Sequence, residues 1–147
     1  MSSSGGLRLG VAQQIAGGVF ELRQQRGYLP LTVAVLDAGG HVVVLQREDG
    51  ASIMRPQIAS GKAWGALGMG LPSRELARRA QGQPQFFAAL APGGLVPVPG
   101  GVLVRDPQTR EIVGAVRVSG DTSDRDEECA VAAIEATGLV ADATAES

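Results

Sequence analysis

The sequence predicts an α/β (α+β) domain in which helices pack against a small antiparallel sheet. Two observations carry this prediction. Pairs of β-branched runs separated by turn sequences indicate hairpins over residues 31–47 and 101–120, and apolar residues at helical spacing indicate helices near both ends of the chain. Hairpins imply antiparallel pairing, because parallel strands need long crossover connections. The predicted order is a helix, two strands, a helical excursion, three strands and a helix.

The first helix is predicted over about residues 7–26. Its apolar residues recur at helical spacing and form one stripe: Leu7, Val11, Ile15, Val19 and Leu22. Gly27 follows as a natural C-terminal stop. The first hairpin turns at the sequence DAGG, where Asp37 can hydrogen-bond the turn backbone and Gly39 and Gly40 tolerate the positive φ of a short loop.

Residues 58–69 are predicted to be helical despite three glycines, each of which costs about 1 kcal/mol relative to alanine. Gly61 and Gly65 lie on one helix face, so we expect this face to pack closely against the sheet or a neighbouring subunit. Short helices over 73–81 and 84–90 complete a surface excursion.

The second half of the chain supplies the remaining strands and the last helix. Pro97 and Pro99 confine a strand over 95–99 to a sheet edge or a bulge, and a hairpin around residues 107–109 follows. The last helix begins at one of several N-cap candidates within residues 119–124 and ends at Gly138. Residues 1–6 and 141–147 are expected to be flexible.

Length and composition exclude several classes of function. The 147 residues are expected to form one domain, and a formal net charge of −2 with scattered basic residues argues against a nucleic-acid partner. No apolar run approaches the roughly 18 residues of a membrane-spanning helix, and the first residues do not form a signal peptide, so we expect a cytoplasmic protein without a membrane partner. The single cysteine, Cys129, excludes an internal disulfide and multi-cysteine zinc sites.

Two residues are candidates for catalysis. His41 is the only histidine, and as an imidazole just after the hairpin turn it could ligate haem, act as a general base, or only bond the backbone at a strand start. Lys62 is the only lysine among 13 basic residues. Its amine could hold a carboxylate or, if desolvated, act as a base or form a Schiff base, and an ion pair with Glu48 or Asp49 is the structural alternative.

Further candidates could bind a ligand. Arg55 precedes Pro56, which restricts its backbone and suits a carboxylate clamp. Asp121 and Asp124 lie in the turn SGDTSD, where they could contact a ligand or cap the last helix. With Glu127 they could also supply oxygen ligands to a hard cation, but the spacing matches no calcium loop, so we predict no metal site. Cys129 is expected to be a buried small apolar residue.

Five separated stretches resemble the GlcG-like and HbpS-like proteins, a haem-binding group that also includes the C-terminal domain of a corrinoid adenosyltransferase. These stretches are VAVLDAGGHVV, REDGA, IASGKAWGA, VPVPGGVLVRD and IVGAVRVSGDTSDRDEECA. With their flanking helices they cover about residues 7–139, in the family's order and spacing. The resemblance implies a profilin-like three-layer sandwich with a five-stranded antiparallel sheet, and a homo-oligomer. Members include haem binders and proteins of pathways for small organic acids and diols.

One departure from the family pattern concerns Arg117, which stands where the family usually has glycine. A long cation there would narrow or re-charge the space that a small residue leaves open. This substitution disfavours a bulky planar ligand such as haem and favours an anionic one. Arg117 therefore joins the candidate ligand-binding residues.

Three classes of function follow from the sequence. The first is a small-ligand-binding protein of this family, with haem as one candidate cofactor. The alternative is a cofactor-free lyase, isomerase or hydrolase that acts on a small oxygenated organic acid in a catabolic pathway. The third is an oligomeric structural or regulatory module without a ligand.

Overall fold

The computed structural model describes residues 6–52, 55, 59, 63, 66–67, 70–90, 92 and 101–143. The elements in this part of the chain are α1 (Leu9–Arg26), β1 (Thr32–Asp37), β2 (Val42–Arg47), α3 (Ser73–Gly82), α4 (Pro84–Leu90), β3 (Gly101–Arg105), β4 (Ile112–Ser119), α5 (Ser123–Glu135) and β5 (Val140–Asp142). The five strands form one antiparallel sheet in the order β2-β1-β4-β3-β5. The predicted fold class is confirmed.

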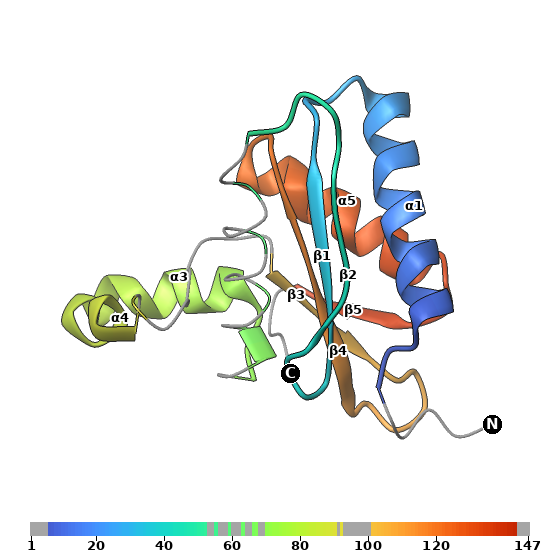
Figure 1. Cartoon of the computed structure of the whole chain (residues 1–147). Helices are drawn as coiled ribbons and strands as arrows, with labels where there is room; N and C mark the ends of the chain where they lie inside the picture. Colours follow the sequence, from blue (N-terminus) through green and yellow to red (C-terminus); the bar gives the residue numbers. More distant parts are fainter. Residues whose placement is uncertain are drawn as a thin grey trace.

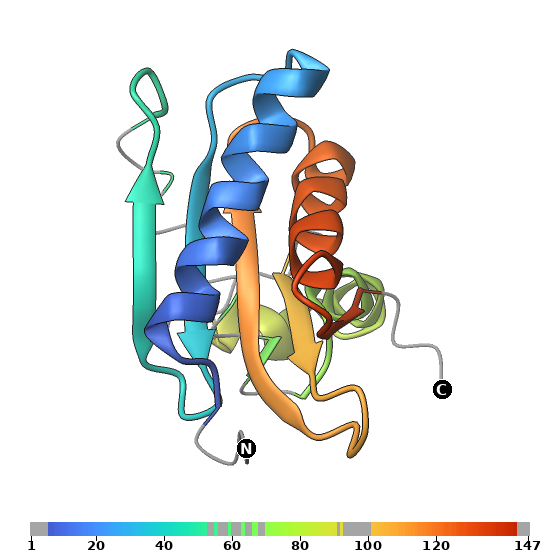
Figure 2. The same cartoon turned by 90° about the vertical axis from the view of Figure 1, so that its right-hand side faces the viewer.

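The molecule has three layers. Helices α1 and α5 lie side by side on one face of the sheet, and α3 and α4 lie on the other side, as two perpendicular views show (Figures 1 and 2). Alternate strand residues point to the two faces. Valines of β1, β3 and β4 form the main core with α1 and α5, and this core includes Val33, Val35, Val102, Val104, Val116 and Val118.

The face of the sheet away from α1 and α5 is called the opposite face below. Leu36, Leu103 and Ala115 form a small apolar cluster on it with Ala63 and Ala66. Ala59, Ala63, Ala66 and Leu67 are helical, in agreement with the helix predicted over 58–69, and the three alanines are fully buried. Arg55, which precedes the predicted helix and was expected in the connection from the hairpin, is helical as well. The glycines of that stretch and Lys62 lie outside the described residues.

Helix α1 and the first hairpin form as the sequence predicts. The helix ends at Gly27, which has a φ of 68° and donates its backbone N–H to the carbonyl oxygen of Gln24. In the hairpin turn, Asp37 Oδ1 accepts the backbone N–H groups of Gly39 and His41, each at 3.0 Å. Gly40 has a φ of 83°. Both predictions depend on local chemistry, and both are confirmed.

The fifth strand differs from the sequence expectation. The stretch 95–99, expected as a strand, lies outside the described residues. Strand β5 is instead Val140–Asp142, which pairs with β3. Asp142 also forms an ion pair with Arg105, at 2.9 Å between Oδ2 and Nε. Residues 141 and 142, expected in a flexible tail, are therefore part of the sheet.

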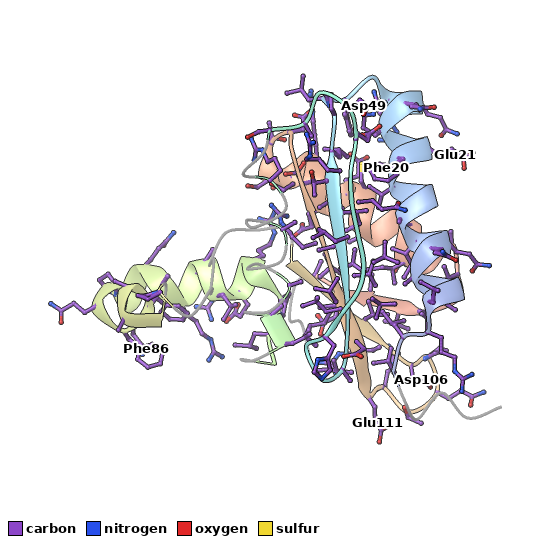
Figure 3. All side chains as sticks on the ribbon, viewed as in Figure 1. Phe20, Glu21, Asp49, Phe86, Asp106 and Glu111 are labelled. Atoms are coloured by element: carbon purple, nitrogen blue, oxygen red, sulfur yellow. The ribbon has the colours of Figure 1, made fainter. Side chains whose placement is uncertain are left out.

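The α3–α4 excursion projects from the opposite face. Leu76 and Phe87 are buried against each other, with Leu71 and Ala80 partly buried beside them. Phe86 lies at the far end of the excursion and is exposed (Figure 3). The excursion thus has a small apolar core of its own, distinct from the two cores on the sheet.

Candidate functional site

Strand β4 carries an arginine in the middle of the sheet. Arg117 and Ser119 share the opposite face with Ala115, since side chains alternate along a strand. The residues directly beside Arg117 on the neighbouring strands are Ala34 of β1 and Gly101 of β3. Two very small residues therefore flank Arg117 within the sheet.

The Arg117 side chain is fully buried, and its nitrogen atoms Nε, Nη1 and Nη2 have no hydrogen-bond partner in the described part of the protein. Its nearest counter-charge is Asp126, with 3.6 Å between Nη2 and Oδ2, which is an ion-pair contact beyond hydrogen-bond length. Burial lowers the pKa of Arg117 to about 9, and the negative charge of Asp126 opposes this shift. Arg117 is therefore still a cation at neutral pH.

Thr32 adds a second unsatisfied group. It is the register partner of Ser119, so the two side chains are neighbours on the opposite face. Thr32 Oγ1 is fully buried and has no hydrogen-bond partner among the described residues. Arg55 donates from Nη1 to Ser119 Oγ at 3.0 Å, and its positive charge contributes to the lowered pKa of Arg117. Arg55 and Arg117 are thus brought together.

Asp126 completes this group at the start of α5. Its carboxylate accepts the backbone N–H groups of Gly120, at 3.3 Å, and Asp121, at 2.9 Å. Burial raises the pKa of Asp126, although these hydrogen bonds and Arg117 act in the other direction. We call Thr32, Arg55, Arg117, Ser119 and Asp126 the polar cluster.

The rim of the polar cluster is an ion-pair network between α3 and α5. Arg74 Nε donates to both carboxylate oxygens of Glu127, at 3.2 and 3.1 Å, and Arg74 also pairs with Asp124. The Asp124 side chain is 84% exposed. The structure therefore places Asp124 on the outside of the rim, bonded to Arg74.

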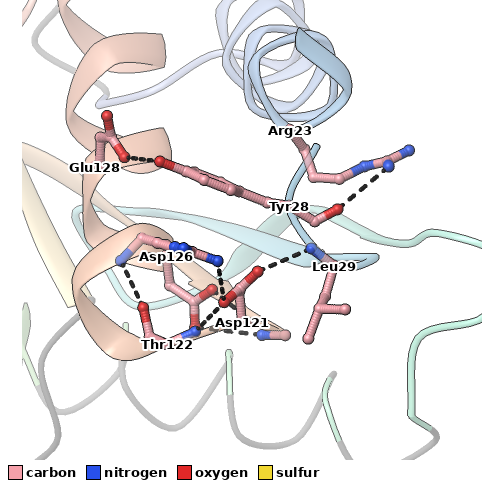
Figure 4. Close-up of polar contacts among 9 residues, drawn as sticks. Arg23, Tyr28, Leu29, Asp121, Thr122, Asp126 and Glu128 are labelled. Atoms are coloured by element: carbon pink, nitrogen blue, oxygen red, sulfur yellow. Dashed lines mark hydrogen bonds and ion pairs between the residues drawn. The ribbon is translucent and has the colours of Figure 1, made fainter. Parts of the chain in front are cut away.

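Asp121 is held in a structural link between the α1–β1 connection and α5. Its carboxylate accepts the backbone N–H of Leu29 at 2.8 Å and of Thr122 at 2.7 Å (Figure 4). The N–H of Leu29 is the main cause of the lowered pKa of Asp121. Thr122 is the N-cap of α5, and its hydroxyl accepts the N–H of Arg125.

His41, one of the two candidate catalytic residues, is not found with these groups. His41 is exposed at the far end of the β1–β2 hairpin, and the five residue steps from Thr32 to Asp37 span roughly 16 Å. No hydrogen bond of its ring is found in the described part of the chain. Lys62 lies outside the described residues. Cys129 is buried, which raises the pKa of its thiol to about 11, so the thiol is protonated at neutral pH.

Three members of the polar cluster were not named as ligand-binding candidates from the sequence: Thr32, Ser119 and Asp126. The hydroxyl of Thr32 is the one polar group within the apolar run LTVAVL. That position becomes informative only when the register is known, because the β1–β4 pairing is what places it beside Ser119. Asp126 lies in the first turn of the last helix, where any carboxylate is favourable to the helix dipole, so the sequence alone does not single it out.

The described residues contain neither a cluster of metal ligands nor a membrane-spanning helix. Among them, no three His, Cys, Asp or Glu side chains gather closely enough to hold a metal ion. None of the described helices has the length and apolar character needed to cross a membrane.

Comparison with known proteins identifies the family. The model of a family described as haem degrading protein HbpS-like matches residues 7–135. The chain belongs to the HbpS-like family. A search of curated proteins gave no match to this HbpS-like chain.

Solved structures agree with this assignment. A crystal structure of a PduOC–haem complex is 25% identical, with a TM-score of 0.81, and the match covers 91% of this chain and 96% of that one. The Klebsiella pneumoniae protein ORFY is 25% identical, with a TM-score of 0.80 and 90% of each chain covered. A double mutant of Streptomyces reticuli HbpS is 28% identical, with a TM-score of 0.79, covering 92% of this chain and 90% of that one.

Proposed function

We propose that this HbpS-like protein binds a small ligand at the polar cluster. The observation that carries the proposal is the group of unsatisfied polar atoms on the opposite face: three nitrogens of Arg117 and the hydroxyl of Thr32. A buried polar atom without a partner costs about 1–3 kcal/mol. Buried groups of this kind are rare in native proteins, and a bound ligand with hydrogen-bonding atoms would satisfy them.

Haem is one candidate ligand, because a structure similar to this chain is a haem complex. His41 supplies the only imidazole of the sequence, and its exposure leaves the ring accessible to an iron ion. The polar cluster contains no side chain of the kinds that usually ligate haem iron. His41 would therefore hold a haem away from the polar cluster. Bound there, haem would supply an iron centre for ligand binding or redox chemistry.

The first experiment is native mass spectrometry of the protein purified directly from cells. A co-purifying small molecule that is lost in Arg117→Met supports ligand binding at the polar cluster. Ligand-free spectra from protein purified under several growth conditions, together with no response of Arg117 to added small acids, would contradict the proposal. The same spectra report the number of subunits, which we propose to be more than one.

A hemin titration tests the haem version separately. We expect a saturable shift of the Soret band in the wild-type protein and its loss in His41→Ala. Thr32→Val is the matched control, since it alters the polar cluster and leaves the hairpin turn intact. A spectrum of free hemin throughout the titration would exclude haem as a ligand and would leave the proposal for the polar cluster unaffected.

A second candidate function is catalysis on a small oxygenated acid. The observation that favours it is Asp126, a buried carboxyl with a raised pKa, 3.6 Å from the Arg117 cation. A buried carboxyl with a raised pKa beside a cation is typical of sites that carry out acid–base catalysis. Incubation with a panel of small acids, followed by mass spectrometry, should reveal turnover that is lost in Asp126→Asn. If Asp126→Asn, His41→Ala and Lys62→Met all retain full turnover, none of these residues is the catalyst.

A further inference from the structure

We infer that the polar cluster recognises the carboxylate group of a small monoanionic organic acid, with the Arg117 guanidinium as the principal donor. This inference rests on the proposed ligand-binding function and specifies the chemistry of the ligand. It is carried by the hydrogen-bonding geometry, the charge balance and the neighbours of Arg117.

The geometry of the donors matches a carboxylate. A guanidinium group presents its N–H donors in one plane and can donate two parallel hydrogen bonds to the two oxygens of a carboxylate. All three nitrogens of Arg117 are unsatisfied among the described residues, so such a pair of bonds is available. The Thr32 hydroxyl, also unsatisfied, can donate a further hydrogen bond.

The charge balance of the polar cluster favours a ligand that carries a single negative charge. Arg55 and Arg117 are cations, and Asp126 is the carboxylate within ion-pair distance of Arg117. Glu127 also acts on the pKa of Arg117, but Arg74 holds it through two hydrogen bonds at the rim. Asp124 also pairs with Arg74, but its side chain is exposed, so water screens its charge. Among the described residues of the buried polar cluster itself, two cations and one carboxylate therefore leave one positive charge, which a monocarboxylate would neutralise. Dianionic phosphate would add a second negative charge next to Asp126, and an uncompensated buried charge is costly.

The neighbours of Arg117 limit the rest of the ligand. Ala34 and Gly101 flank it across the sheet, and Ala115 precedes it on the same face. Leu36 and Leu103 follow in the apolar cluster of the opposite face. These residues suit a short and largely apolar substituent on the carboxylate.

The inference is tested with the full-length protein labelled with ¹⁵N and titrated with propionate. We expect a saturable shift of the Arg117 Nε–H resonance, which is assigned by its loss in Arg117→Met. Propionamide, which has the same shape without the charge, should give no shift. Inorganic phosphate should bind at least tenfold more weakly than propionate. An unchanged Arg117 resonance, or phosphate that binds as tightly as propionate, would overturn the inference.

Calorimetry of variants assigns the donors. Hydrogen bonds to charged groups contribute about 1.5–3 kcal/mol, so we expect propionate affinity to fall more than tenfold in Arg117→Met and about tenfold in Thr32→Val. Thr32→Val replaces a hydroxyl by a methyl of the same shape, so it still tests the site if Arg117→Met fails to fold. Arg23→Met is the matched control, because Arg23 is a partly buried arginine paired with Glu48. Its affinity for propionate should equal that of the wild type, and wild-type affinity in both cluster variants would contradict the assignment.

The outcomes separate this inference from the proposed function. If native mass spectrometry finds a neutral ligand that is lost in Arg117→Met, ligand binding stands and the carboxylate inference fails. If propionate shifts Arg117 but no molecule co-purifies, the carboxylate chemistry stands and the ligand dissociates during purification. If neither result is obtained, both proposals fail.

Discussion

Arg117 lies on a central strand between Ala34 and Gly101, and none of its three guanidinium nitrogens is hydrogen bonded within the described structure. A buried cation whose one counter-ion lies beyond hydrogen-bond length is a poor stabiliser of a fold, because the cost of its desolvation offsets the attraction. Its presence is better explained by binding than by folding. Stability and ligand affinity should therefore respond in opposite directions to substitutions in the polar cluster.

Thr32→Val is expected to raise the free energy of unfolding of the ligand-free protein by about 1 kcal/mol, because it removes a buried hydroxyl without a partner. Thr122→Val is the matched control: the Thr122 hydroxyl caps α5, so its loss should cost about 1 kcal/mol. Urea unfolding at pH 7 measures both changes. A destabilised Thr32→Val protein would show that this hydroxyl has a partner in the ligand-free state.

Asp121 should make the fold sensitive to acid. Its pKa is lowered chiefly by the backbone N–H of Leu29, so its folded-state pKa lies below the unfolded value of about 3.9. Its contribution to stability is therefore fully present above the unfolded pKa and is lost as the pH falls through the lower, folded pKa. Asp126, whose pKa is raised, affects the pH dependence of stability in the opposite direction. Its carboxyl is present in both the wild type and the Asp121→Asn variant.

The measurement is urea unfolding of the wild type and Asp121→Asn from about pH 7 down to about pH 2, the range in which carboxylates protonate. We expect the wild type to be the more stable at pH 7 and the two proteins to converge in acid. Parallel curves over the whole range would show that the carboxylate of Asp121 contributes no charge-dependent stability.

At the scale of elements, the contact between α1 and α5 depends on which glycine faces the neighbouring helix. A Cβ atom added at Gly17 would have no atom within 4 Å, whereas one at Gly18 would lie 3.2 Å from the Cβ of Ala133 on α5. The two adjacent positions thus form a natural pair for comparison.

Gly17→Ala should raise the free energy of unfolding by about 0.5–1 kcal/mol, since alanine is the better helix former. Gly18→Ala should lose this gain, because its new methyl group must displace Ala133. Thermal unfolding of both variants tests the difference. Equal stabilisation by the two substitutions would mean that α1 and α5 are packed less closely than the structure shows.

Elements were predictable where their signals are local. Gly27 ends α1 and Asp37 organises the hairpin turn through atoms only a few residues away, so the sequence alone indicates both. Strand β5 was not recognised because three residues with no clear alternation gain their structure from pairing with β3, far away in the sequence. The same limit applies to Thr32 and Ser119, whose proximity depends on the β1–β4 register.

At the scale of the whole molecule, the α3–α4 excursion is joined to α5 by Arg74. Its pairs with Glu127 and Asp124 connect two elements that lie on different sides of the sheet (Figures 1 and 2). Arg78 is a matched arginine on the same helix, but it pairs with Glu75 within α3 itself. Comparing variants of these two arginines therefore separates the effect of docking the excursion against α5 from the effect on the stability of α3.

Hydrogen exchange should be faster in α3 and α4 than in β1 and β4, which are buried between two layers. Arg74→Met should increase exchange in α3 by about fivefold, the effect of losing about 1 kcal/mol from partly exposed ion pairs. Arg78→Met should leave docking intact and alter only the first helical turns. Identical exchange in both variants would mean that Arg74 does not hold the excursion to α5.

Of the ligand-binding candidates, the sequence indicated Arg55 and Arg117 through their chemistry, and the fold brings these two together. The sequence could not show that the carboxylate of Asp121 accepts a backbone N–H group or that Asp124 pairs with Arg74, because those partners come from distant segments. His41 has the chemistry of a site residue, but its place at the end of a hairpin is set by sheet geometry, which separates it from the polar cluster.

Strand β4 has one further consequence. Its odd-numbered residues 115, 117 and 119 belong to the face that carries the polar cluster, and its even-numbered residues 116 and 118 belong to the core beneath α1 and α5. Alternate residues of β4 thus serve the hydrophobic core and the proposed ligand site. Substitutions in one set of residues can leave the other set intact. Inserting a single residue into β4, in contrast, would move the side chains that follow it to the other face of the sheet.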